Sequence, residues 1–310
     1  MSNPAPLGVR LIAPGKINLA LEVVGRRPDG YHDIDTVMTT IDLADRVTIE
    51  RRPERAGLEV VLSGSHAADI DPADDLAGRA AIRLAEAEGR SPDLRIQVEK
   101  RIPSPAGLGG GSSDAAAVLR GLRRLWALDW PDERLAALGA TIGSDVPFFV
   151  YGGAARCTGR GEEVQPLRDL RPLRLLILVP PVPPSPNKTA ARYGALAPHD
   201  FSDGTRSRRL AQRLARRAPP PTNDLVNAFE AVVERTEPEL VAHYAAYHAQ
   251  GAPRLHLCGA GPAVYLFVRE TAKVSELRRD FQQRGATVFD TWTLPRERAL
   301  VIEEIEEPAA

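Results

Sequence analysis

Residues 103–113 read Pro-Ser-Pro-Ala-Gly-Leu-Gly-Gly-Gly-Ser-Ser, and Asp114-Ala115-Ala116-Ala117 follows directly. The four glycines allow the backbone to bend through conformations closed to other residues and to approach a ligand closely. Apolar residues then recur at three- and four-residue spacing from Ala115 to Trp126, which predicts a helix that Ser112 or Ser113 could cap. Because a helix start exposes unpaired N–H groups and positive partial charge, the stretch predicts a phosphate-binding loop.

This loop differs from two common nucleotide-binding motifs. It lacks the Gly-Lys-Ser/Thr that closes a Walker A loop, and Ser112 stands where a dinucleotide fingerprint has its last glycine. Residues 94–100, which precede it, alternate apolar and polar side chains. That pattern predicts a half-solvated antiparallel strand, unlike the buried strand of a Rossmann unit. A tight structural turn remains the alternative interpretation of the glycines.

Length and composition are compatible with two domains. A chain of 310 residues with 43% hydrophobic side chains can bury a large core. The composition changes near Leu173, where an apolar run precedes a proline-rich connector. We therefore expect one domain over residues 1–172 and a second over residues 173–310.

Charge, cysteine content and hydropathy argue against several classes of protein. Forty basic and forty-one acidic residues leave a net charge of −1, so the chain lacks the field that nucleic acid or an anionic membrane attracts. Cys157 and Cys258 lie far apart, which argues against a zinc module and for a reducing, cytoplasmic compartment. The N-terminal residues do not resemble a signal peptide, and residues 173–182 are too few to span a bilayer. We expect a monomer or weak homodimer without a nucleic-acid or membrane partner.

Hydrophobic patterning predicts the remaining elements. A strand over residues 9–24 is interrupted at 13–18 by Ala-Pro-Gly-Lys-Ile-Asn. The other predicted elements are strands 35–41, 46–51 and 58–62, helices 75–88 and 132–138, strand 173–180, helices 206–217 and 222–230, strands 254–257 and 263–268, helix 274–284 and strand 286–294.

Two charged residues stand in apolar surroundings. Lys16 lies next to Pro-Gly within an apolar strand, and Asn18, two positions on, shares its face. Asp145 stands between Gly143-Ser144 and a wholly apolar segment, where a carboxylate is unfavourable without a partner. We interpret Asp145 as a catalytic carboxylate paired with a lysine. A helix cap or turn is the alternative for Asp145, and a solvated surface position is the alternative for Lys16.

Tyr31-His32 follows the turn signal Pro28-Asp29-Gly30 and offers an aromatic face beside a hydrogen-bonding ring. A hairpin turn with a surface aromatic is the alternative. The predicted helix over 206–217 carries six arginines, with Leu210 and Leu214 one turn apart. Because the whole chain is nearly neutral and no aromatics are interleaved, we interpret it as a solvated helix face, with an assembly surface as the alternative.

Three segments carry a resemblance to a known family. They are Pro14-Gly15-Lys16-Ile17-Asn18, residues 103–116 and Gly259-Ala260-Gly261-Pro262. Together they resemble the three motifs of the GHMP kinases, a superfamily of small-molecule kinases. Residues 27–32 (Arg-Pro-Asp-Gly-Tyr-His) and 143–149 (Gly-Ser-Asp-Val-Pro-Phe-Phe) look like the branch that phosphorylates a methylerythritol carrying a cytidine diphosphate, in the non-mevalonate isoprenoid pathway.

The resemblance implies an α+β fold with two domains, a ribosomal-S5-like N-terminal α/β domain and a ferredoxin-like C-terminal domain, with the active site between them. It implies ATP as the phosphoryl donor and Mg²⁺ as cofactor, and assigns no protein ligand to the metal. The residues that it assigns to the nucleotide are Lys100, Pro103, Ser104, Pro105, Ala106, Gly107, Leu108, Gly109, Gly110, Gly111, Ser112 and Ser113.

The resemblance also implies roles at the acceptor. Asp145 would accept or orient the proton of the acceptor's 2-hydroxyl, and Lys16 would pair with Asp145 and steady the transferring phosphoryl group. The residues that it assigns to the substrate are Asn18 for the methylerythritol hydroxyls, Tyr31 and His32 for the cytosine, Tyr193 as a second aromatic against the base, and Thr189 nearby. Since phosphoryl transfer needs little covalent help from the protein, positioning and charge neutralisation would dominate.

Two positions depart from the family pattern. The family usually has Asn-Leu at the start of the helix predicted over 75–88, where this sequence has Asp75-Leu76. If the asparagine contacts adenine, this departure changes the contacts to the nucleotide. The usual Ser-Gly-Ser-Gly is Cys258-Gly259-Ala260-Gly261, which lacks two hydroxyls but keeps the glycines. Another GHMP enzyme, such as a homoserine or mevalonate-class kinase, and a binding protein without catalysis remain alternatives. Tyr31-His32 disfavours the first because those substrates carry no base, and the retention of Lys16 with Asp145 disfavours the second.

Overall fold

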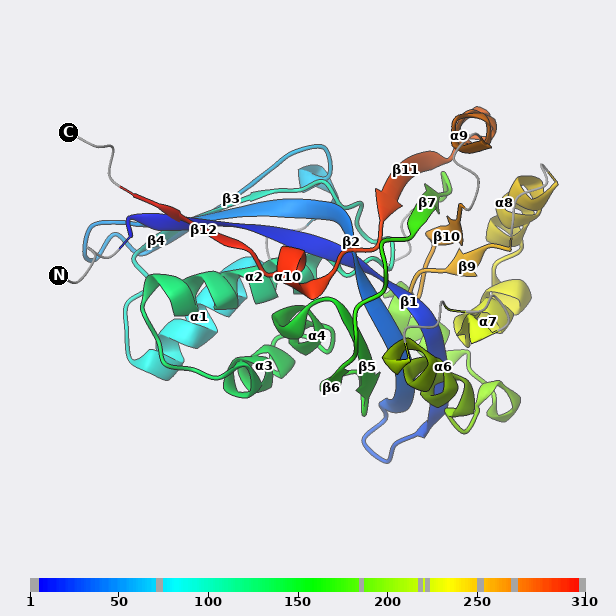
Figure 1. Ribbon diagram of the computed structural model, residues 1–310, viewed down its shortest axis with the longest axis horizontal. Coiled ribbons are helices and arrows are strands. Elements are labelled where there is room, and N and C mark those ends of the chain that lie inside the picture. The colour runs from blue at the N-terminus through cyan, green and yellow to red at the C-terminus, as the bar shows by residue number, and fades with distance from the viewer. Residues whose placement is uncertain are drawn as a thin grey trace.

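The computed structural model describes residues 6–70, 75–183, 187–216, 220, 224–249, 254–268 and 273–306. Within these ranges the chain forms a sheet of eight strands and a sheet of four, with helices packed on both (Figure 1). This α+β architecture agrees with the fold class predicted from the sequence.

A long antiparallel hairpin of β1 (Gly8–Arg26) and β2 (His32–Arg51) forms the backbone of the larger sheet. The strand order is β12-β1-β2-β4-β3, while β5 pairs with β2, β6 with β5, and β8 with β1. The remaining strands are β3 (Leu58–Ser63), β4 (Leu94–Glu99), β5 (Ala154–Thr158), β6 (Glu163–Pro166), β8 (Val226–Asn227) and β12 (Ile302–Ile305).

Helices cover one face of this sheet (Figure 1). They are α1 (Leu76–Glu88), α2 (Gly110–Leu125), α3 (Asp132–Ala140) and α4 (Val146–Tyr151). The predicted spacing in α2 is confirmed, because Val118, Leu119 and Leu122 are fully buried against the sheet residues Val47 and Ile49. A side-chain cap fixes the start of α1, where the Asp75 carboxylate accepts the backbone N–H groups of Ala77 and Gly78 at 3.1 and 2.8 Å.

The smaller sheet has the order β11-β7-β10-β9. Its strands are β7 (Arg174–Val179), β9 (His256–Leu257), β10 (Val264–Phe267) and β11 (Thr287–Trp292). The other helices are α5 (Lys188–Gly194), α6 (Thr205–Ala215), α7 (Phe229–Thr236), α8 (Pro238–His248), α9 (Val274–Gln283) and α10 (Arg296–Ala299), with 3₁₀ turns at Ala67–Asp69 and Pro198–Asp200.

Strand β7 presents both faces to apolar neighbours. Leu176 and Leu178 pack with α7, α8 and α9, whereas Leu175 and Ile177 pack toward Ile17 in β1 and the apolar side of α6. This second contact joins the two sheets through a shared core and fixes the cleft between them.

Two strand predictions are wrong at the hairpin. The expected break at 13–18 is absent, because register shifts between Pro14 and Lys16 and between Asn18 and Ala20 keep the strand paired. The segments 35–41 and 46–51 belong to the single strand β2. The polar residues between them remain in the strand because Asp42 accepts the backbone N–H of Trp292 at 2.9 Å and Asp45 that of Ile102 at 2.8 Å.

The helix expected over 222–230 begins later than predicted. Residues 222 and 223 lie outside the described ranges, β8 occupies Val226–Asn227, and α7 starts at Phe229. Asn227 explains the change, since its amide donates to the carbonyls of Leu257 and Gly259 at 3.0 and 2.8 Å and draws the chain into a strand. Strands β8 and β12 come from the second half of the chain but pair with β1 in the first half. The two halves therefore share one sheet, and the domain boundary at residue 172 stays a prediction.

The predicted basic helix is α6, which ends at Ala215, and Arg217 lies outside the described ranges. Among the helices that the structure describes, none is long and apolar enough to cross a membrane.

Candidate active site

A cavity of about 1250 Å³ lies between the Gly-rich loop, β1 and β2, α5 and the turn at Gly259–Gly261. It collects most of the residues that the sequence assigned to a site. Those that line it are Lys16, Asn18, Tyr31, His32, Ser104, Pro105, Gly107, Gly109, Gly111, Ser112, Asp145, Thr189 and Tyr193. Pro103 and Ala106 line a second cavity of about 510 Å³, on the other side of the Ser104-Pro105 turn. Lys100, Leu108, Gly110 and Ser113 line neither.

The centre of the cavity holds a lysine and a carboxylate. Lys16 is 4% exposed, and its Nζ lies 3.8 Å from the Asp145 Oδ2 and donates to the Asn18 Oδ1 at 2.8 Å. Asn18 is held in turn, because its amide donates to the Thr36 hydroxyl at 2.9 Å. The predicted shared face of Lys16 and Asn18 is thereby confirmed. The Asp145 side chain is 34% exposed, so its carboxylate remains open to the cavity.

Close backbone approach explains the glycines around this centre. A side chain at Gly107, whose φ is +85°, would collide with the Cys258 carbonyl. A Cβ at Gly259 would lie 2.7 Å from the Lys16 Nζ. The Lys16 backbone N–H also donates to the Leu108 carbonyl at 2.9 Å. The Gly-rich loop is therefore fastened to both β1 and the Cys258–Gly261 turn.

Helix α2 starts one turn earlier than a serine cap would allow. Its N-cap is Gly109, with φ +75° and ψ 19°, so the predicted capping by Ser112 or Ser113 is wrong. The left-handed glycine turns the chain directly into the helix, and both serines lie in its first turn. Gly109, Gly111 and Ser112 line the cavity, so the start of this helix, where N–H groups have no intrahelical partner, lies at the cavity wall.

A second lysine lies behind the loop. Lys100 is 1% exposed, and its amine donates to the carboxylates of both Asp45 and Asp114. Burial by itself would lower the pKa of Lys100, but the two carboxylates together outweigh it and raise that pKa above its usual value. Asp45 also accepts the backbone N–H groups of Arg101 and Ile102 at 2.5 and 2.8 Å. The Lys100 amine thus anchors the base of the loop and does not reach the cavity.

Aromatic rings form the other end of the cavity. His32 stacks on Tyr193 with ring centroids 5.1 Å apart and an interplanar angle of 26°. Phe201 meets His32 edge-on at 6.1 Å, and the Arg160 guanidinium lies 4.9 Å from the centroid of the Tyr31 ring. Burial, with a further contribution from Arg26, lowers the pKa of His32. A neutral imidazole among aromatic faces suits a flat, uncharged ring as ligand.

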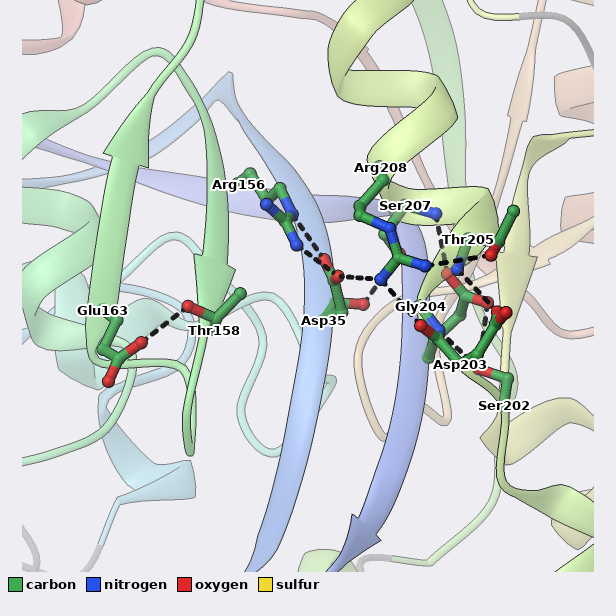
Figure 2. A network of polar contacts seen from close by, with 11 residues as sticks. Asp35, Arg156, Thr158, Glu163, Ser202, Asp203, Gly204, Thr205, Ser207 and Arg208 are labelled. Carbon is green, nitrogen blue, oxygen red and sulfur yellow. Dashed lines mark hydrogen bonds and ion pairs between the residues drawn. The ribbon is translucent and has the colours of Figure 1, made fainter.

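A polar network holds this aromatic end in place (Figure 2). The Arg156 guanidinium donates to both oxygens of Asp35 at 2.8 and 2.6 Å, and Arg208 of α6 lies 3.9 Å from the same carboxylate. The Ser207 hydroxyl donates to the Asp35 carbonyl at 2.8 Å. Figure 2 shows that these groups join β2, β5 and the start of α6, which fixes the segment carrying Phe201.

Comparison with known proteins identifies the family. The family model described as GHMP kinases N terminal domain matches residues 75–153. A relative from Dehalococcoides mccartyi, named 4-diphosphocytidyl-2-C-methyl-D-erythritol kinase, is 36% identical over 284 residues, covering 92% of this chain and 98% of the relative. A Bacillus subtilis protein of the same name is 38% identical over 272 residues, covering 86% of this chain and 90% of that protein. The chain belongs to the 4-diphosphocytidyl-2-C-methyl-D-erythritol kinase family.

Solved structures agree with this assignment. A crystal structure of 4-(cytidine 5'-diphospho)-2C-methyl-D-erythritol kinase matches with a TM-score of 0.74 at 33% identity, covering 92% of this chain and 99% of that one. Homoserine kinase from Cytophaga hutchinsonii matches with a TM-score of 0.73 but only 13% identity, covering 98% and 99% of the two chains, so it shows the fold alone. The predicted GHMP kinase resemblance, the two-domain α+β fold and the small-molecule kinase class are confirmed.

Sequence reasoning missed several residues of the 4-diphosphocytidyl-2-C-methyl-D-erythritol kinase cavity. Arg160, Phe201 and Phe229 line its aromatic end, and Lys188 lines its wall near the loop. Gly159-Arg160-Gly161 is a turn signal that could have marked Arg160. No comparable local signal points to the two phenylalanines, which come from segments far from Tyr31 in the sequence.

Proposed function

We propose that this protein transfers a phosphoryl group from ATP to the 2-hydroxyl of 4-diphosphocytidyl-2-C-methyl-D-erythritol. One observation carries the proposal. Lys16, Asn18 and Asp145 lie in the same cavity as the Gly-rich loop on one side and the His32–Tyr193 stack on the other. A phosphoryl donor at the loop and an acceptor with a base among the rings would therefore meet at Asp145. The names of the family's members support this choice of substrate.

At the donor side, the backbone of residues 103–113 would surround the phosphates of ATP. The support is the left-handed Gly109, which starts α2 without a side-chain cap at the wall of the cavity. Lys100 would act on the nucleotide only through the loop, because its amine is held by Asp45 and Asp114. Asp75, one of the two departures from the family pattern, caps α1 and lines the cavity next to Leu76, so this position would lie beside the nucleotide.

At the acceptor side, Asp145 would take up or orient the proton of the attacking hydroxyl. Lys16 would neutralise charge on the phosphoryl group in transit, and Asn18 would position the hydroxyls. Tyr31 and His32 would hold the cytosine against Tyr193, with Thr189 beside it. Parting of the His32–Tyr193 stack would admit the base between two rings whose centroids now lie 5.1 Å apart.

The donor set is compatible with Mg²⁺ as the cofactor. This ion keeps several waters and is usually bound through phosphates with one or two carboxylates, so a protein cage is not required. Asp114 and Ser112 line the cavity, and the Oδ1 of Asp114 is buried without a hydrogen-bond partner among the described residues. These oxygens would hold the ion beside the nucleotide, where it would neutralise phosphate charge. Within the described part of the chain, no cluster of three or more His, Cys, Asp or Glu side chains suggests another metal site.

We also propose a cellular location and an oligomeric state. We place the enzyme in the cytoplasm, since Cys157 and Cys258 are both buried and unpaired, as in a reducing compartment. We propose a monomer or weak homodimer without a nucleic-acid partner. In α6, Arg208 and Arg209 already face Asp35 and Asp224 at 3.9 and 3.8 Å, so part of the basic face is used within the chain.

The test is ADP release with ATP and Mg²⁺ in the presence of different acceptors. Diphosphocytidyl-methylerythritol, mevalonate, homoserine and galactose are compared at equal concentration. We expect turnover with the cytidyl acceptor alone. Turnover with another acceptor would keep the kinase and remove the base pocket from the site. Absence of turnover with all four would favour a binding protein that keeps the fold.

A further inference from the structure

Lysine is rare in this protein, which has four lysines and thirty-six arginines. Three of the four, Lys16, Lys100 and Lys188, lie at the Gly-rich loop. An ammonium group is a compact point charge with three donors, while a guanidinium is a larger planar fork. Lys16 and Lys100 each face a carboxylate, as described above. Lys188 differs from both.

Lys188 is the first residue of α5 and connects two turns. Its amine donates to the Pro105 carbonyl of the Gly-rich loop at 3.2 Å and to the Gly261 carbonyl of the opposite turn. Within the described ranges, no carboxylate lies within ion-pair distance of this amine. The side chain lines both the large cavity and the smaller one behind Ser104-Pro105. The amine therefore marks the wall where the two phosphate-side turns meet.

The charge of Lys188 is not compensated in the free protein. Burial, with a further contribution from Arg192 one helical turn away, lowers the pKa of Lys188 to about 8. Glu237 opposes the shift, but both of its oxygens already accept from the Arg192 guanidinium at 2.7 and 2.6 Å. An anion arriving at this wall would raise this pKa again and favour the charged form of the amine.

We propose that Lys188 binds a phosphate group of a ligand in the cavity, at the junction of the Gly-rich loop and the Gly259–Gly261 turn. The inference rests on the proposed function of the cavity. An ammonium with one donor left after two carbonyls, at the wall between phosphate-side turns, is suited to a phosphate oxygen. That phosphate comes from the nucleotide donor or from the diphosphate of the acceptor, and direct binding separates the two.

The experiment is calorimetric titration of the full-length protein with cytidine, CDP and ADP. Lys188→Met removes the charge, Lys188→Arg keeps it, and Lys273→Met is the matched control, since Lys273 lines neither cavity. We expect Lys188→Met to weaken CDP or ADP by about tenfold to hundredfold, with cytidine unchanged. The diphosphate that loses affinity identifies the source of the phosphate. Lys188→Arg is expected to retain most of the affinity, and Lys273→Met all of it.

A second readout is proton uptake on binding at pH 8, obtained from the buffer dependence of the binding enthalpy. The wild type should take up a fraction of a proton with the diphosphate that contacts Lys188, and Lys188→Met should take up less. Arg192 and Glu237 are the charged groups that act on this amine, and both are present in all variants.

Two results would overturn the inference. Equal losses for cytidine and CDP would show that Lys188 only ties the two turns together, and unchanged affinity for both diphosphates would remove it from the site. Wild-type protein that binds neither diphosphate would contradict the proposed function as well, so the two failures are distinguishable. Thermal unfolding of each variant verifies that the fold is retained.

Discussion

Two lysine–aspartate sites flank the Gly-rich loop, one open and one closed. In the open site the Lys16 and Asp145 side chains are 3.8 Å apart, and the carboxylate is 34% exposed to the cavity. In the closed site Lys100 lies between Asp45 and Asp114, and none of the three side chains is more than 5% exposed. The same residue types therefore serve different ends. A group that must meet a ligand stays open to the cavity, whereas the Lys100 amine, which holds the loop, is enclosed by two carboxylates.

Burial determines the electrostatics of the closed site. Desolvation raises the pKa of the Asp114 carboxyl well above its usual value, and Asp45 adds to the shift while Lys100 opposes it. A carboxylate pair in this position is unfavourable unless the lysine stays between its members. The backbone bonds from Arg101 and Ile102 to Asp45 transmit this arrangement to the start of the loop.

The largest effect is expected at the open site. Asp145→Asn keeps the shape of the side chain but removes its charge and proton affinity. We expect phosphoryl transfer to fall about hundredfold to ten-thousandfold, with ADP affinity changed by less than about threefold. Initial rates of ADP release and calorimetric ADP binding measure the two quantities. The matching change Asp132→Asn, outside the cavity, should leave the rate unaltered. If Asp145→Asn turned over like the wild type, the proposed role of Asp145 would be wrong.

At the closed site the expected effect is on stability. Lys100→Met leaves two buried carboxylates without their cation, so the free energy of unfolding should fall by about 3–5 kcal/mol. Urea denaturation measures the loss, and Lys273→Met, which removes an exposed lysine, should change it by less than about 0.5 kcal/mol. A stable Lys100→Met variant with weakened ADP binding would instead restore the direct nucleotide contact that the family resemblance implied.

Local patterns explain what could be predicted from the sequence. The glycines, the spacing in α2 and the two-residue offset of Lys16 and Asn18 are encoded within short segments, and the structure confirms each of these elements. The pairing of Lys16 with Asp145, which the family resemblance implied, is also observed. The glycines, the helix spacing and the Lys16–Asn18 offset have a local signature because the local backbone conformation places those residues, whereas the Lys16–Asp145 contact depends on the fold.

The closed site had no such signature. Asp45 and Lys100 are 55 positions apart in the sequence. From the sequence alone, Asp45 was predicted to be one polar residue in a turn between two strands. Only the pairing of β2 with β4 brings them together. Strand β12 was missed for the same reason, since its acidic sequence is stabilised by pairing with β1 and not by its own propensity.

A smaller effect is expected from the aromatic end. Tyr31 is 55% exposed, with the Arg160 guanidinium over its ring, so Tyr31→Ala should raise KM for the cytidyl acceptor about threefold to tenfold through lost stacking. The value of kcat should stay within about twofold, because Tyr31 is remote from the reacting hydroxyl in the proposed arrangement. Trp292→Ala is the matched control, as Trp292 is 42% exposed, has Arg174 over its ring and does not line the cavity. An unchanged KM for Tyr31→Ala would remove Tyr31 from the substrate site.

The smallest expected effect is the change in stability when His32 is protonated. The response of its pKa to a ligand shows whether His32 belongs to an open site, as Asp145 does, or to a closed one, as Lys100 does. Burial, with Arg26, lowers the pKa of His32 below its ordinary value of 6.5, so the folded protein binds this proton less readily than the unfolded chain. Its contribution to stability is present above pH 6.5 and is lost as pH falls through the lower folded pKa. Because the ring is partly solvated, the change should amount to a few tenths of a kcal/mol. An NMR titration, with His32→Gln to assign the resonance, measures the pKa directly. Cytidine should lower the pKa of His32 further, since a base stacked on the ring removes more water from the charged form. If cytidine does not change this pKa, His32 does not contact the ligand and has a structural role, as Lys100 does.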